Sequence, residues 1–156
     1  MNFGIQVDPA FAEFLNGKRA RLLEGLRNTM VFQTGALSRY IKETKLSGQV
    51  LRNITGNLRN AVFPSVETAG TQIIGRVSVD NSAPYGKYQE YGAHIPERVP
   101  VRARVLHWVS GGADVFAMRA RAFDLRARPF MRPSLEERRA AILEALSTSI
   151  QGALRA

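Results

Sequence analysis

Two short segments decide the fold: Ala83-Pro84-Tyr85-Gly86-Lys87-Tyr88-Gln89-Glu90-Tyr91-Gly92 (residues 83–92) and Arg128-Pro129-Phe130-Met131-Arg132-Pro133 (residues 128–133). In the first, an early proline, tyrosines three residues apart and a final glycine predict one or two turns of helix. In the second, two prolines bracket an apolar pair, which predicts that Phe130 and Met131 stay outside any helix until Pro133 releases one. Both segments have the composition of anchors that pack against the same chain or against copies of it.

Hydrophobic periodicity on the N-terminal side of these segments predicts a strand, helices and a hairpin. Alternating Phe3, Ile5 and Val7 predict a short strand. A helical pattern runs from Pro9 to about Lys45, and Asn16-Gly17 is expected to divide it into a short and a long helix. Residues 46–57 read as a loop, and residues 58–62 as either a last helical turn or the start of a strand. Residues 62–79 predict two strands joined at Ala69-Gly70.

On the C-terminal side, a second hairpin and a long helix are expected. A loop at 94–100 precedes two strands, 101–109 and 115–122, which turn at Ser110-Gly111-Gly112. Residues 124–132 read as extended, and residues 134–137 as a capping box that opens the final helix. That helix runs to about Leu154. Its expected inward residues are Leu135, Ile142, Leu146, Ile150 and Leu154.

The element order predicts an α+β fold, in which a mainly antiparallel sheet is packed by a long N-terminal helix and a C-terminal helix. A length of 156 residues is typical of one domain, which we place at 1–156. The N-terminus lacks the basic start and apolar run of a signal peptide, and no segment has the length of a membrane helix. We therefore expect a soluble protein that does not associate with a membrane.

Charge indicates partners more than fold. The formal net charge is +9, which suits nucleic acid, a membrane surface or acidic protein surfaces. Arginines dominate the later part of the chain. If the second hairpin forms as predicted, Arg102, Arg104, Arg119 and Arg121 alternate with apolar residues along one face of it, near Trp108 and Phe116.

No pattern of catalytic or ligand-binding residues stands out. The absence of cysteine excludes disulfides, thiolate nucleophiles and cysteine zinc sites. His94 and His107 fall in different predicted elements, no serine sits in a nucleophile elbow, and no phosphate-binding glycine loop occurs. We expect no enzyme activity, no cofactor and no metal. The tyrosine triplet has two open interpretations, since such a stripe is typical either of a core edge or of an interface.

Three ordered segments resemble a known protein family. Residues 46–61, with Leu46-Ser47-Gly48 and Thr55-Gly56-Asn57-Leu58-Arg59-Asn60-Ala61, resemble its Leu-Ser-Gly … Thr-Gly-x-Leu-Arg-x-Ser/Ala segment. Residues 81–92 resemble its Tyr-Ala-x-Tyr-x-Glu-Phe-Gly segment, with Gly86 at the usual alanine. Residues 128–135 resemble its Arg-Pro-Phe-Leu-x-Pro-Ala-Leu segment. The family is that of small tail-completion, tail-terminator and virion-morphogenesis proteins (minor tail proteins of the lambda Z type) of tailed bacteriophages.

The resemblance implies a structural virion protein at the head–tail junction. Such proteins form a homo-oligomeric ring, often a hexamer, that caps the tail tube and joins it to the connector and stopper proteins of the head. The protein would be in the tail or neck of the virion, and in the host cytoplasm during assembly. Expected interface residues are Tyr85, Tyr88, Tyr91, Arg102, Arg104, Arg119, Arg121, Arg128, Phe130 and Met131.

Some alternatives stay open. The basic face would meet either protein or phage DNA in the lumen of the ring. A basic nucleic-acid-binding module is the second interpretation of the chain. An assembly factor that is absent from the mature virion is the third.

Overall fold

The computed structural model describes residues 9–51, 56–70, 72–101 and 104–155. The predicted strand of Phe3, Ile5 and Val7 lies outside these residues. The chain divides into two compact units: residues 1–83 together with 130–156, here called the helical unit, and residues 84–129, here called the strand unit. The α+β class is confirmed, and the assignment of one domain to 1–156 stays a prediction.

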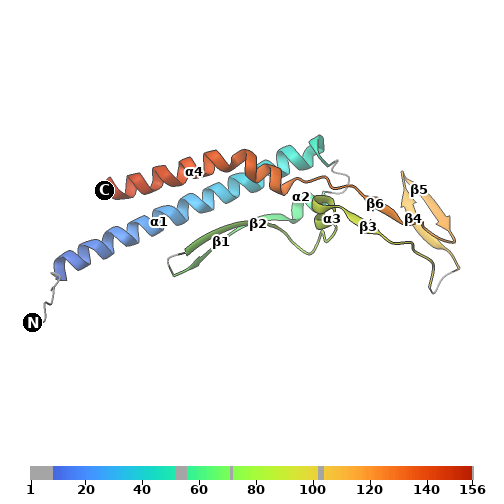
Figure 1. Cartoon of the computed structure of the whole chain (residues 1–156), viewed down its shortest axis with the longest axis horizontal. Helices are drawn as coiled ribbons and strands as arrows, with labels where there is room; N and C mark the ends of the chain where they lie inside the picture. Colours follow the sequence, from blue (N-terminus) through green and yellow to red (C-terminus); the bar gives the residue numbers. More distant parts are fainter. Residues whose placement is uncertain (1–8, 52–55, 71, 102–103, 156) are drawn as a thin grey trace, which may run out of the picture. The chain divides into compact units, whose positions relative to one another are not determined.

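Two long helices lie side by side in the helical unit (Figure 1): α1 (Pro9–Tyr40) and α4 (Met131–Arg155). The predicted break at Asn16-Gly17 is wrong, because α1 passes through both residues. A glycine inside a helix costs only about 1 kcal/mol, which packing along the helix offsets. The chain continues as a wide π-type helix, η1 (Ile41–Gln49), where Gly48 has a positive φ of 127°.

The core of the helical unit is small and lies where α1, η1, the first strand and the start of α4 meet. Its buried members are Leu37, Ile41, Leu46, Val62 and Phe130. Leu46 was expected in a loop, but η1 extends the helix and carries this side chain inward. Phe130 has no exposed surface at all, so it is a core residue of the helical unit.

The helical unit also contains the predicted first hairpin. The short helix α2 (Asn57–Ala61) leads directly into β1 (Val62–Ala69), which pairs antiparallel with β2 (Gln72–Val79). Both strands pack on α1. Gly75 lies close against the helix: a Cβ there would come within 2.5 Å of the Thr34 methyl group and 2.7 Å of the Met30 sulfur. The register thus depends on a residue without a side chain at this crossing.

The predicted start of α4 is wrong in detail. The helix begins at Met131, three residues before the expected cap, because proline is tolerated in a first helical turn and Pro133 lies there. Ser134 is fully buried and its hydroxyl donates to the carbonyl of Phe130 at 2.5 Å, so it is not an N-cap. Glu137 makes contacts outside the helix in place of a capping bond.

Glu137 joins α4 to the end of α1 and to η1. The Lys45 ammonium donates to Glu137 at 2.8 Å, and the Tyr40 hydroxyl donates to the same carboxylate at 2.5 Å. Lys45 is nearly buried, so its charge needs this partner. The hydrogen bond to Glu137 is the main cause that raises the pKa of Lys45, and the bond from Lys45 is the main cause that lowers the pKa of Glu137.

The strand unit contains one short helix and four short strands. The tyrosine helix is confirmed as α3 (Gly86–Tyr91). β3 (Ala93–Ile95) pairs with β6 (Phe123–Leu125), and β4 (Leu106–Ser110) pairs with β5 (Ala113–Ala117), all antiparallel. Among the described strands there are thus three separate two-stranded pairs in place of one sheet.

The second hairpin is shorter than predicted, although its turn is confirmed. Gly111 and Gly112 both have positive φ, as a two-residue hairpin turn of the primed type requires. Arg104 precedes β4, and Arg119 and Arg121 follow β5, so the expected row of arginines along the hairpin is wrong. Arg102 lies outside the described residues. The loop expected at 94–100 contains the end of β3.

We expect Phe130→Ala to destabilise the helical unit by about 3–5 kcal/mol, because it empties a fully buried aromatic site. Urea denaturation followed by the helical circular dichroism signal measures this. Phe32→Ala is the matched control: Phe32 is 71% exposed on α1, and its loss should change stability by less than about 0.5 kcal/mol. Equal effects of the two substitutions would contradict the assignment of Phe130 to the core.

Acid should weaken the helical unit through Glu137. The pKa of the Glu137 carboxyl is lower in the folded state than its unfolded value of 4.5. Such a carboxyl stabilises the fold at pH values above 4.5, and this contribution is lost as the pH falls through the folded pKa. Between about pH 6 and pH 3, the free energy of unfolding should therefore fall less for Glu137→Gln than for the wild type. Urea denaturation at a series of pH values measures the slope. An unchanged slope for Glu137→Gln would refute this role.

Candidate binding groove

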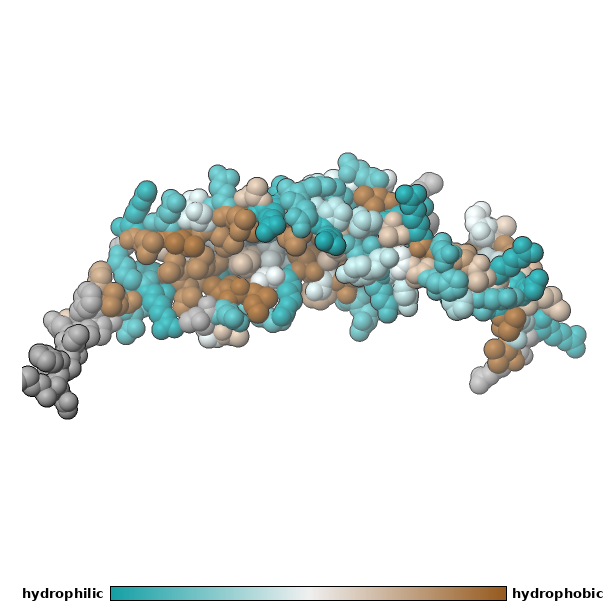
Figure 2. All heavy atoms as spheres, in the orientation of Figure 1, coloured by the Kyte–Doolittle hydropathy of each residue, from teal (hydrophilic) through white to brown (hydrophobic). Residues whose placement is uncertain are grey.

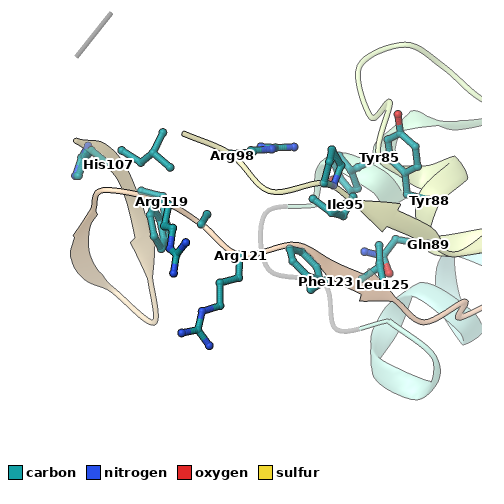
Figure 3. A pocket seen from close by; sticks show the side chains of 14 residues that line it. Tyr85, Tyr88, Gln89, Ile95, Arg98, His107, Arg119, Arg121, Phe123 and Leu125 are labelled. Carbon is teal, nitrogen blue, oxygen red and sulfur yellow. The ribbon is translucent and has the colours of Figure 1, made fainter. Parts of the chain in front are cut away.

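A groove of about 750 Å³ opens in the strand unit (Figure 3). It is lined from every element of this unit except β5. The lining residues are Tyr85, Tyr88, Gln89, Ile95, Pro96, Arg98, Leu106, His107, Trp108, Arg119, Ala120, Arg121, Phe123 and Leu125. Most are apolar or aromatic, and the three that carry a formal charge are arginines.

Gly92 and the chain after β6 hold α3 beside the groove. The helix stops at Gly92, which has a φ of 76°. A Cβ at this position would lie 2.8 Å from the Leu125 carbonyl oxygen and 3.1 Å from the Ala127 nitrogen. The amide of Arg128 donates to the carbonyl of Gln89 at 2.7 Å. These contacts fix Tyr85 and Tyr88 relative to β6.

An interrupted strand pair positions the arginines. The β3–β6 ladder stops after Ile95, which lies opposite Phe123, because Pro96 has no amide proton to donate. The same register resumes at Arg98 and Ala120, whose backbones exchange two hydrogen bonds of 2.9 Å. Arg98 is thereby held opposite the segment that contains Arg119 and Arg121.

The acidic side chains near the groove already have partners. Arg119 pairs with Glu97 at 3.6 Å, and His94 lies 2.6 Å from Asp124, its cross-strand neighbour. His107 contacts Asp114 at 2.7 Å and stacks on Phe116. Within the described part of the chain, no carboxylate lies within 4.0 Å of the guanidinium groups of Arg98 and Arg121. These two positive charges are therefore available to a ligand.

The predicted interface residues that the structure describes are distributed over both units. Tyr85, Tyr88, Arg119 and Arg121 line the groove, whereas Tyr91 is 81% exposed and Arg104 and Arg128 are not among the lining residues. Phe130 and Met131 belong to the helical unit, where Phe130 is buried.

The sequence missed the role of several lining residues, among them Arg98, Ile95 and Phe123. Residues 94–100 read as a loop because prolines stand at 96 and 100, so a strand pairing between 93–98 and 120–125 was not anticipated. The one signal in the sequence was the pair of short apolar runs on either side of the second hairpin, whose matching would have suggested this register.

The arrangement suits ligand binding. An apolar and aromatic floor beside unpaired guanidinium groups would hold a ligand that is both apolar and anionic. Among the residues that the structure describes, no group of three or more histidine, aspartate or glutamate side chains is placed to hold a metal ion. None of the described helices combines the length and apolar character needed to cross a membrane.

Comparison of the chain with protein-family models, with curated proteins and with solved structures gave no match. The resemblance to phage tail-completion proteins therefore rests on the three sequence segments alone.

Gly92→Ala should loosen the groove. Alanine at a positive φ costs about 1–3 kcal/mol, and its Cβ would also meet the Leu125 carbonyl. Trp108, the one tryptophan of the chain, reports unfolding of this unit by its fluorescence. Gly112→Ala is the control: it carries the positive φ but has nothing within 4 Å of its Cβ. Gly92→Ala should therefore lower stability more than Gly112→Ala, and the reverse order would refute the close contact with β6.

Proposed function

We propose that the chain is a non-enzymatic structural protein of the phage neck, which assembles as a homo-oligomeric ring at the head-proximal end of the tail tube. In the family that it resembles, such rings are often hexamers and join the tube to the connector and stopper proteins of the head. The proposal places the protein in the virion and, before assembly, in the host cytoplasm.

The observation that carries the proposal is the uncovered apolar surface of α4. Leu143, Ile150 and Leu154 are 56%, 38% and 66% exposed. Their spacing of seven and four residues puts them on one helix face. Sequence periodicity had assigned Ile150 and Leu154, together with Leu135, to the core, but all three are exposed in the single chain. This helix face has the sequence pattern of a core but is exposed to solvent. Such a face supports the presence of a partner that covers it.

The balance of buried and exposed apolar residues points the same way. Within the described part of the chain, seven apolar residues are buried while twenty large ones are exposed. Figure 2 shows apolar side chains gathered over the helical unit. Phe14 and Phe32 on α1 are among the exposed apolar residues of this unit. Association that buries such a surface lowers the free energy of the protein. Assembly is thus the kind of function that best accounts for these residues.

A ring requires two different surfaces that meet head to tail. The apolar face of α4 would supply one of them. The second candidate function, a nucleic-acid-binding module, is favoured by the arginines and aromatic rings of the groove, but it leaves the apolar face of α4 without a role.

We expect the wild type either to form a closed oligomer in solution or to bind purified tails, with its mass measured by light scattering at moderate salt. Leu143→Glu combined with Leu154→Glu should weaken assembly more than about tenfold, since each buried interface anchor contributes over about 1 kcal/mol. The monomer should keep its helical content, because both side chains are exposed.

The matched control is Asn16→Glu combined with Ala20→Glu, which adds the same charge at exposed positions of α1. It should assemble as the wild type does. A wild type that stays monomeric and ignores tails would refute the ring. Normal assembly of the Leu143 and Leu154 double variant would refute the role of the α4 face.

A further inference from the structure

We propose that the groove of the strand unit binds an acidic segment of a partner protein, in which an apolar side chain is flanked by carboxylates. This inference concerns residues 84–129 alone and does not require the ring. It states which kind of ligand the groove binds, whereas the proposed ring depends on the apolar face of α4.

The first argument is charge. Arg98 and Arg121 have no carboxylate partner in the described residues, and Arg119 is held only by an exposed ion pair of 3.6 Å. Guanidinium groups form paired hydrogen bonds to carboxylates in one plane. In Figure 3, Arg98 lies on one chain segment of the groove and Arg119 and Arg121 on the other. Carboxylates on both sides of a bound segment would meet them.

The second argument is the floor between the charges and α3. Ile95 and Phe123 face each other across the strand pair, and Figure 3 shows them between the arginines and the two tyrosines, Tyr85 and Tyr88. A volume of about 750 Å³ lies within the range of about 300–1,000 Å³ typical of ligand sites. An apolar side chain buried on this floor would anchor the segment and would set the positions of its neighbouring carboxylates.

A second copy of this chain fits the groove less well. The chain carries a net charge of +9, and many of its carboxylates are engaged within their own copy. Ion pairs hold Glu67, Glu97, Asp114, Asp124, Glu136 and Glu137. A copy with this excess of positive charge would meet a groove whose formally charged lining residues are all arginines, which disfavours the contact.

Nucleic acid fits less well also. A single strand calls for a cationic track along its phosphates and aromatic faces for its bases. Here the described lining has three arginines in place of a continuous cationic track, and its aromatic rings share the groove with aliphatic side chains: Ile95, Pro96, Leu106, Ala120 and Leu125. Such a floor suits an apolar amino-acid side chain.

Trp108 makes the proposal directly testable, because it is the single tryptophan of the chain and lines the groove. The probe is a synthetic peptide, acetyl-Asp-Glu-Leu-Asp-Phe-Glu-Asp-amide, titrated into the full chain at low salt. We expect a saturable shift of the Trp108 emission to shorter wavelength as the ring is covered. The peptide with Asn and Gln in place of Asp and Glu should bind at least about tenfold more weakly, and added salt should weaken the acidic peptide.

Two groove variants test the two arguments separately. Arg98→Gln combined with Arg121→Gln removes the free charges and should weaken peptide binding about tenfold or more. Phe123→Ala removes part of the floor, keeps the charge and should also weaken binding. The matched control, Arg19→Gln combined with Arg21→Gln, loses the same charge at exposed positions of α1 and should bind as the wild type does. The emission of each free variant checks that the strand unit is folded.

Several results would overturn the proposal. No saturable shift with the acidic peptide, equal binding of the neutral peptide, or unchanged binding by both groove variants would each do so. If the Arg19 and Arg21 control lost as much peptide affinity as the Arg98 and Arg121 variant, the effect would come from net charge and not from the groove. Binding of a thymidine 12-mer in place of the peptide would assign the groove to nucleic acid. Self-association that the groove variants abolish, with no peptide binding, would assign it to a second copy.

Discussion

Burial of Phe130 is the constraint on which the helical unit depends. This side chain has no exposed surface and packs with Leu37, Ile41, Leu46 and Val62, so it brings together α1, η1, β1 and the start of α4. The chain reaches Phe130 only after the whole of the strand unit, residues 84–129. Closing the core of the helical unit therefore closes a long loop, which is entropically unfavourable and is offset by the apolar area that Phe130 buries.

The polar contacts around that core have a different role. A buried ammonium at Lys45 would be strongly unfavourable without Glu137, and Glu137 also accepts from Tyr40. A shift of α4 along α1 and η1 would separate Glu137 from both donors. Hydrophobic contact brings the helices together without fixing their alignment, whereas this network specifies it.

The small size of the core explains why so much apolar surface stays uncovered. Both long helices carry apolar residues on more than one face, but in the single chain each has only part of its surface covered. Leu143 and Leu154 on α4, and Phe14 and Phe32 on α1, are left in solvent. The strand unit has a similar character, since its strands are three to five residues long and each described pair has two open edges. Both units thus leave apolar side chains or strand edges uncovered in the single chain.

The sequence by itself determined the local elements whose cause is local. Gly70, Gly92 and the pair Gly111-Gly112 end or turn the chain where positive φ is required. Tertiary structure alone decided what depends on distant partners: that α1 continues through Asn16-Gly17, that Ser134 is buried and not a cap, and that β3 pairs with β6 across the second hairpin. The groove belongs to this second class. Its arginines and floor come from segments about 25 residues apart, and three-residue strands carry too little pattern for their pairing to be legible before the chain is folded.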